Sequence, residues 1–229
     1  MKRLAQSSLW LVLCLGSLAI TLSSIVYFHP NERPPFIIEK LPLPAENLYL
    51  LLLRLHVVVA ALALPGCMIL SSKAVLKRWP RFHRYSGRLI GGLVIGVLAP
   101  TGFYLAFFAR GGVGATLGFL LTGAIVLVAM VQAIRAARAK QFAQHRRFTF
   151  HVLGQLSVAV TSRAMLHLLE SSSNFDPDIA YLISLWIPVL GTFALVEGFF
   201  SPKRLNLFSR SNYEPMAHPS AIPGSGIDV

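Results

Sequence analysis

Six apolar stretches constrain the fold of this chain more than any other feature of its sequence. A helix needs roughly 20 mostly apolar residues to cross the hydrocarbon core of a bilayer, because it rises only about 1.5 Å per residue. Each of the six stretches meets that requirement, and short polar connections separate them. The pattern therefore predicts an all-α fold, an integral membrane bundle of six transmembrane helices. The stretches cover residues 7–28, 47–70, 89–109, 114–134, 150–170 and 180–200.

The composition excludes a soluble globular protein. Hydrophobic residues make up 55% of the 229 residues, charged residues make up 13%, and the mean hydropathy is +0.62. A soluble domain of this length could not bury so much apolar surface, so the surplus requires lipid as its solvent. The formal net charge of +12 would suggest nucleic-acid binding in a soluble protein. Here the basic residues lie in the connections between spans, so we expect no nucleic-acid partner.

The distribution of Lys and Arg predicts the orientation in the membrane. Sixteen of these residues fall on one side, at the N-terminus, in the connections that follow the second and fourth spans, and after residue 200. The connections on the other side hold Arg33, Lys40 and Arg110. By the positive-inside rule both termini are cytoplasmic. We expect a multi-pass protein of the cell (inner) membrane.

The chain divides into five segments around a four-helix core. The first segment acts as a signal anchor unless it is cleaved as a signal peptide, which its MKR start and SLA sequence would also permit. Its apolar run continues through LSSIVYF to a membrane-spanning length, which favours the anchor. The segments are an N-terminal transmembrane helix (1–28), a Pro-rich outer loop (29–46), the four-helix core (47–170), an outer loop with the last transmembrane helix (171–200) and a disordered cytoplasmic tail (201–229).

Ionisable side chains inside the predicted spans need a partner or a role, because charge is costly in lipid. The second span carries Arg54 and His56. The fifth span carries Arg163, His167 and Glu170 at positions i, i+4 and i+7, which share one helix face. We expect this stripe to face the bundle interior, toward Arg54 or His56. It is either a salt bridge that fixes helix packing or a cofactor, quinone or proton site.

Two basic connections resemble each other. SSKAVLKRWPRFHRYSGR follows the second span and RAARAKQFAQHRRFTFH follows the fourth, and His83 and His145 stand 62 residues apart at matching places. The likeness suggests a duplicated hairpin, although the positive-inside rule alone would place Lys and Arg, but not His, in both connections. Arg84 and Arg88, at i and i+4, would project together at a helix start, where backbone N–H groups also favour an anion.

These motifs carry a family resemblance. The LH pair at 55–56, HRYSGR at 83–88, RGGVGATLGF at 110–119, HRRF at 145–148 and the later Arg163 resemble an uncharacterised family of bacterial multi-pass predicted membrane proteins, a domain of unknown function. The resemblance covers residues 50–170 or so, with the first and last spans as additions. It implies a multi-pass inner-membrane protein without an established activity.

Three functions fit these residues. The leading hypothesis is haem b-linked electron transfer, to or from quinone, with histidines of different helices on the iron and arginines holding the haem propionates. The second is a non-enzymatic scaffold or assembly protein whose basic rim, including Trp79 and Arg81, contacts anionic lipid headgroups or a membrane partner subunit. The third is a small-solute or proton transporter that uses the stripe in the fifth span. Because no nucleophile, phosphate-loop or metalloprotease motif occurs, whether the chain is an enzyme stays open.

The haem hypothesis defines the candidate site. His56 and His167 are candidate iron ligands in the outer half of the membrane, although helical rise separates them by about 10 Å in depth. On the inner side His83, His145 and His151 cluster at one level, which also suits a ligand pair. Glu197, in the last span, is interpreted as a boundary residue near Lys203 and Arg204 rather than as a proton carrier. The candidate cofactor-binding residues are His56, His83, His145, His151, His167, Arg84, Arg88 and Arg163.

Overall fold

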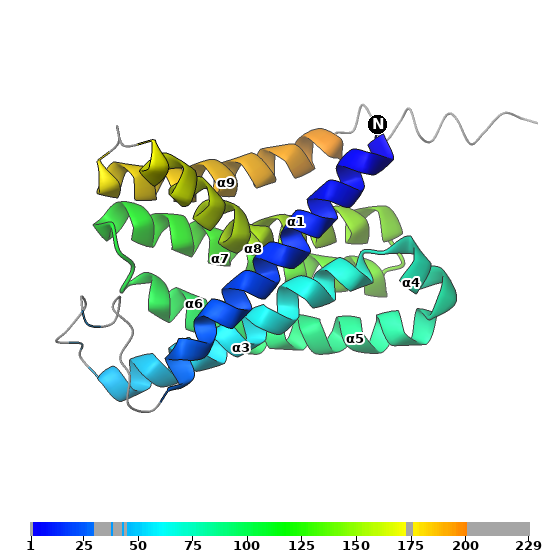
Figure 1. Cartoon of the computed structure of the whole chain (residues 1–229). Helices are drawn as coiled ribbons and strands as arrows, with labels where there is room; N and C mark the ends of the chain where they lie inside the picture. The colour runs from blue at the N-terminus through cyan, green and yellow to red at the C-terminus, as the bar shows by residue number, and fades with distance from the viewer. Residues whose placement is uncertain (1, 30–37, 39–42, 44, 173–175, 201–229) are drawn as a thin grey trace, which may run out of the picture.

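The computed structural model describes residues 2–29, 38, 43, 45–172 and 176–200. Most of the loop predicted at 29–46 and all of the tail predicted at 201–229 lie outside these residues. Throughout the described part of the chain the regular structure is helical (Figure 1). The elements are α1 (Lys2–Ser23), η1 (Ser24–Phe28), α3 (Glu46–Leu70), α4 (Lys73–Arg78), α5 (Pro80–Leu93), η2 (Val94–Leu98), α6 (Ala99–Ala106), α7 (Gly112–Arg138), α8 (Phe142–Ser171) and α9 (Pro177–Phe199).

Six helical segments are long and apolar enough to cross a membrane, which confirms the predicted all-α bundle of six spans. The third span is continuous through α5, η2 and α6, and the short helix α4 connects it to the second. The six spans are Ser8–Phe28, Glu46–Leu70, Pro80–Ala106, Gly112–Arg138, Phe142–Ser171 and Pro177–Phe199.

Helix α8 is central to the packing, because it lies along both α7 and α9. Helix α3 packs against α5, η2 and α6 and also reaches α8. Helix α1 crosses obliquely over α3 and α8 (Figure 1). A Cβ atom at Gly16 would lie only 2.3 Å from Val160 Cγ1, so the glycine allows α1 to approach α8 closely.

The bundle has two distinguishable ends (Figure 1). One end, which we call the basic end, holds the start of α1, helix α4, the connection between α7 and α8, and the last turn of α9. The other, which we call the opposite end, holds the connection between α6 and α7 and the start of α9. The Lys- and Arg-rich sequences 73–88 and 135–147 therefore lie together at the basic end.

The starts of two helices lie furthest ahead of their apolar stretches. Helix α5 begins at Pro80 and α8 at Phe142, rather than at residues 89 and 150. Proline suits the first position of a helix, since its missing N–H would have no intrahelical partner there. An apolar stretch marks only the part of a helix that lies in hydrocarbon, so it misses the basic turns beyond it. The residues of RFHRYSGR and HRRF accordingly form the first turns of helices.

The third span contains a wide π turn at η2, immediately before α6. Pro100 lies in the first turn of α6. A proline inside a helix lacks the N–H that would bond four residues back, and its ring presses on that carbonyl. The wider turn gives the ring room without breaking the span.

The connection between α6 and α7 depends on two glycines. Gly111 and Gly112 have φ angles of +86° and +62°, which residues with side chains rarely adopt. A Cβ atom at Gly111 would also lie 3.1 Å from Tyr181 Cδ1. The turn therefore needs glycine for its backbone angles and for its close approach to α9.

The core is apolar, and much of the outer surface is apolar as well. Val94, Val152 and Val189 are fully buried between helices. Leucines such as Leu15 and Leu62 are more than half exposed on the outside of the bundle. So large an apolar surface indicates contact with lipid.

Candidate functional site

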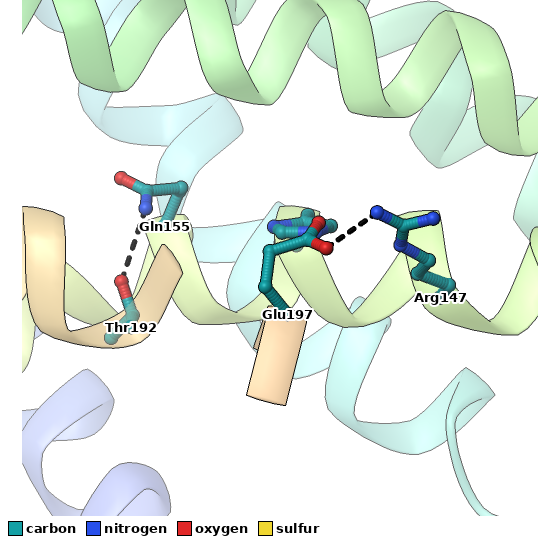
Figure 2. A network of polar contacts seen from close by, with 5 residues as sticks. Arg147, Gln155, Thr192 and Glu197 are labelled. Carbon is teal, nitrogen blue, oxygen red and sulfur yellow. Dashed lines mark hydrogen bonds and ion pairs between the residues drawn. The ribbon is translucent and has the colours of Figure 1, made fainter. Parts of the chain in front are cut away.

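A row of polar side chains joins α8 to α9 near the basic end. Arg147, His151 and Gln155 stand at i, i+4 and i+8 on α8 and face Glu197 and Thr192 of α9 (Figure 2). Arg147 Nη2 donates to Glu197 Oε2 at 2.5 Å, and His151 Nε2 lies 2.8 Å from Glu197 Oε1. Each carboxylate oxygen therefore has its own partner on α8. We call these five residues the α8–α9 seam.

Gln155 forms the inner end of the seam. Its side-chain Nε2 donates to the Val189 carbonyl and to Thr192 Oγ1, both at 3.0 Å. The Thr192 hydroxyl in turn donates to the Pro188 carbonyl. A Cβ atom at Gly154 would lie 3.3 Å from Thr192 Cβ, so the two helices approach closely here. The seam thus ends in tightly packed protein.

Burial increases along the seam. The side chains of Arg147 and Glu197 are 39% and 36% exposed, whereas the His151 side chain is 5% exposed and Gln155 is 2% exposed. The His151 ring also contacts the Phe193 ring, with the two centroids 5.0 Å apart. Among the described residues, three buried seam atoms find no hydrogen-bond partner: Arg147 Nε, His151 Nδ1 and Gln155 Oε1. Leaving such an atom unpaired costs about 1–3 kcal/mol, so each needs an explanation.

His83 and His145 come near each other at the basic end. His145 turns its Nδ1 to the Ala133 carbonyl of α7, at 2.9 Å. The His83 ring, on α5, lies within electrostatic range of His145 and interacts with the Leu70 carbonyl of α3. Its Nδ1 is nevertheless buried without a partner in hydrogen-bonding geometry. The structure thus brings two of the three inner histidines together, while the third, His151, is turned to Glu197.

His56 lies against the third span rather than beside another histidine. Its Nδ1 is 3.0 Å from Thr101 Oγ1, and that hydroxyl donates to the Val97 carbonyl in the π turn. The Thr101 hydroxyl gives its hydrogen to Val97, so towards His56 it can only accept. His56 Nδ1 must therefore carry the hydrogen in this contact. A Cβ atom at Gly102 would lie 3.2 Å from His56 Cε1, so the glycine makes room for the ring.

The stripe of Arg163, His167 and Glu170 is exposed on α8, so the prediction that it faces the interior is wrong. The side chains of His167 and Glu170 are 83% and 50% exposed and lie 4.0 Å apart. Arg163 Nη1 donates to the Ala159 carbonyl of its own helix. The inward face of α8 at this level is taken by apolar residues such as Val158, which packs with α9.

The predicted partners of the stripe are engaged elsewhere. Arg54 Nε donates to the Tyr27 carbonyl at the end of η1, at 2.8 Å. His56 is held by Thr101 inside the bundle, whereas His167 points outward. The structure therefore does not bring His56 and His167 together.

Arg84 and Arg88 are exposed on the first turns of α5. The Arg88 guanidinium lies 5.9 Å from the centre of the Tyr85 ring. Trp79, Phe82 and Tyr85 are exposed beside them, so this part of the basic end combines aromatic and basic side chains.

Comparison with known proteins identifies the family. The model of a family described as "Predicted membrane protein (DUF2306)" matches residues 53–199, which is more than half of the chain. The chain belongs to the DUF2306 family. The resemblance inferred from the motifs is thereby confirmed. No curated protein and no solved structure matches the chain.

The DUF2306 region includes α9 and leaves α1 outside. It therefore extends beyond the residues 50–170 over which the motifs were recognised. The α8–α9 seam and both His83 and His145 lie within the DUF2306 region. The candidate sites thus belong to the part of the chain that defines the family.

The seam contains residues whose role sequence reasoning missed. Glu197 was interpreted as a boundary residue near Lys203 and Arg204, which lie outside the described residues. In the structure Glu197 accepts from Arg147, and its other oxygen meets His151. Two signals in the sequence could have found it. The spacing of residues 147, 151 and 155 places three polar side chains on one face of a span, and Glu197 is an acid in the next span.

Proposed function

We propose that this DUF2306 protein binds haem b in the membrane and carries electrons, with His83 and His145 as the iron ligands. The supporting observation is that these two histidines, from α5 and α8, come near each other at the basic end. Histidines from facing helices are a usual way for a helical bundle to hold a haem. This pair replaces His56 and His167, which the structure keeps apart.

The surroundings of His145 suit a role as an iron ligand. Its Nδ1 meets the Ala133 carbonyl, which fixes the ring and leaves Nε2 available. Ligating histidines commonly donate the other ring N–H to such a carbonyl. His83 has a corresponding neighbour in the Leu70 carbonyl. Among the described residues no cluster of three or more His, Cys, Asp or Glu could hold a bare metal ion, and a haem needs only these two protein ligands.

The helix arrangement also suits a flat group between the two rings. Helix α5 packs on α3, η2 and α7, whereas α8 packs on α7 and α9. Helices in direct contact are about 8–10 Å apart, which leaves no room for a ring system between them. Helices α5 and α8 are not a closely packed pair, so helix contact does not fill the space between the two segments that carry His83 and His145.

A haem iron held by two imidazoles supplies one-electron chemistry. In this proposal His83 and His145 fix the group, and the exposed guanidinium groups of Arg84 and Arg88 bind its propionates at the basic end. We place the basic end on the cytoplasmic side of the cell (inner) membrane, by the positive-inside rule. A membrane quinone is the proposed class of redox partner.

The test is the visible absorption spectrum of protein purified in mild detergent after expression with added haem. Air-oxidised and dithionite-reduced samples should show a Soret band and a narrow α-band on reduction. His83→Ala and His145→Ala should each abolish this spectrum. Arg84→Ala and Arg88→Ala should weaken haem retention.

His167→Ala is the matched control, because that side chain is exposed. His56→Ala tests the competing assignment, and it should keep the spectrum. A colourless wild-type protein that is folded by circular dichroism would refute haem binding. A spectrum that is lost in His56→Ala and kept in His83→Ala would refute the ligand pair.

A second candidate function is a scaffold that binds anionic lipid headgroups at the basic end. The observation that favours it is the exposed group of Trp79, Phe82 and Tyr85 beside Arg84 and Arg88 on the first turns of α5. Aromatic and basic side chains together are typical of the membrane interface. Thermal stability in nanodiscs should then rise with anionic lipid, and the double substitution of Arg84 and Arg88 by Ala should remove that rise.

A further inference from the structure

We propose that the α8–α9 seam is an internal water site at which His151 takes up a proton from the basic end and gives it back. The site is separate from His83 and His145, and it does not depend on haem. Its ligand is water, its proton-accepting group is His151, and the Glu197 carboxylate is the counter-ion of the imidazolium. Its inner limit is Gln155.

The unpaired atoms of the seam define the site. Arg147 Nε, His151 Nδ1 and Gln155 Oε1 are buried on three successive turns of one face of α8. Arg147 Nε offers a hydrogen, Gln155 Oε1 accepts one, and His151 Nδ1 can do either. Buried waters typically make about three hydrogen bonds to such groups. Side chains at i and i+4 stand about 5–6 Å apart at Cβ, which is a separation that one water can bridge.

The enclosure of the seam selects water over a larger ligand. His151 and Gln155 are almost completely buried, and Gly154 brings α8 close to Thr192 of α9. A quinone or a lipid headgroup would need exposed polar atoms at this place. An anion is disfavoured because the Glu197 carboxylate already neutralises Arg147.

The contacts allow a balanced proton step. The neutral His151 donates its Nε2–H to the Glu197 carboxylate, 2.8 Å away, and its Nδ1 accepts a hydrogen bond from the water. A hydronium ion at the basic end passes its proton through this water to Nδ1 and leaves a water molecule behind. The imidazolium is then held beside the Glu197 carboxylate, which stays paired with Arg147. Arg147 stays protonated throughout. Within the described residues, Arg147 and His151 are the charged or titratable groups that interact with Glu197, and both belong to α8.

The seam gives access from one end only. From Arg147 to Gln155 it rises about 12 Å, which is less than half of the hydrocarbon thickness. At the inner end of the seam, the Gln155 side-chain amide is held by the Val189 carbonyl and by Thr192 Oγ1. The seam therefore exchanges protons with the basic end, and it is not a channel through the membrane.

The water is tested by X-ray hydroxyl-radical footprinting of the full-length protein in detergent. Radicals formed from bound water label the side chains next to it, even where bulk water has no access. His151 should be labelled faster than Met68, an intrinsically more reactive residue that is buried in the apolar core. In Gln155→Leu, or in Gln155→Met should the first variant not fold, the labelling of His151 should be lost. Labelling of His151 no faster than that of Met68 would overturn the proposal.

The proton is tested by infrared difference spectroscopy of the same protein on acidification. The wild type should show the imidazole bands of His151 converting to imidazolium bands, and these bands are assigned by their loss in His151→Phe. Glu197→Gln should reduce the conversion, because the imidazolium loses its carboxylate partner, whereas Glu170→Gln, whose side chain is exposed, should leave it unchanged. Absence of an imidazolium band that depends on His151, or an unchanged conversion in Glu197→Gln, would overturn the proton role even with water present.

Discussion

Helix α8 carries the same pair of residues twice, and the two copies have opposite surroundings. Arg147 and His151 stand at i and i+4, and Arg163 and His167 repeat that spacing sixteen residues later. Sixteen residues rotate a helix by about 160°, so the two pairs lie on nearly opposite faces. The first pair meets Glu197 of α9, whereas the second is exposed beside Glu170 of its own helix.

The difference shows that polar spacing in a span identifies a shared face but not its direction. In the first pair His151 is buried and Arg147 is partly exposed, and a neighbouring helix supplies a carboxylate to both. The second pair has its acid three residues along the same helix, 4.0 Å from His167, which requires no contact with another helix. The partner helix therefore decides which polar face becomes internal.

The largest effect on the free energy of unfolding is expected for Glu197→Leu. We expect the free energy of unfolding to fall by about 2–3 kcal/mol, because the buried His151 loses its acceptor, while the partly exposed Arg147 adds little. For a chain of this size each kcal/mol corresponds to about 2–4 °C in the unfolding midpoint. Thermal denaturation in detergent measures the change. Glu170→Leu is the control, and an equal fall in both variants would remove the distinction between the two pairs.

A smaller effect is expected for Arg147→Leu. Its guanidinium is partly exposed, so we expect a loss of about 1 kcal/mol, since His151 remains to hold Glu197. Arg163→Leu should cause a smaller loss, because it removes an exposed arginine whose hydrogen bond, among the described residues, is to its own helix and whose interaction with Tyr181 of α9 is electrostatic. The same denaturation series compares the two variants. A loss in Arg163→Leu as large as that in Arg147→Leu would indicate that the outer pair has a hydrogen-bonding partner on another helix.

The smallest effect is expected within the outer pair. A double-mutant cycle of His167→Ala and Glu170→Gln should give a coupling energy of about 0.2–0.5 kcal/mol, as for exposed pairs one turn apart. The corresponding cycle of His151→Ala and Glu197→Gln should give a larger coupling, because His151 is buried. Equal couplings would mean that burial does not distinguish the pairs.

The fold was predictable because membrane spans are determined by apolar length. The six stretches correspond to the six spans, and the glycine-rich turn after residue 110 lies between α6 and α7. The starts of α5 and α8 were not predictable in the same way, because their first turns are basic and carry no apolar signal. The π turn before Pro100 carries no signal in apolar length either, and it packs against α3.

The candidate site was predictable only in part. The likeness of the two basic connections drew attention to His83 and His145, which interact electrostatically at one end, and their role stays a prediction. The direction of the stripe at 163–170 was wrong, because the sequence does not state where α9 packs around α8. Glu197 was missed for a related reason, since its partners are some fifty positions earlier in the chain.

The contact between Arg54 and the Tyr27 carbonyl has a consequence for biosynthesis. An arginine at the centre of a span raises the insertion free energy by about 2.5–3.5 kcal/mol, and Arg54, in the first third of α3, would carry part of that cost. The acceptor of Arg54 is a carbonyl at the end of η1, where backbone oxygens lack helical partners. Because the Tyr27 carbonyl is synthesised before Arg54, we expect the first two spans to enter the bilayer as a pair, with Arg54 bonded to that carbonyl.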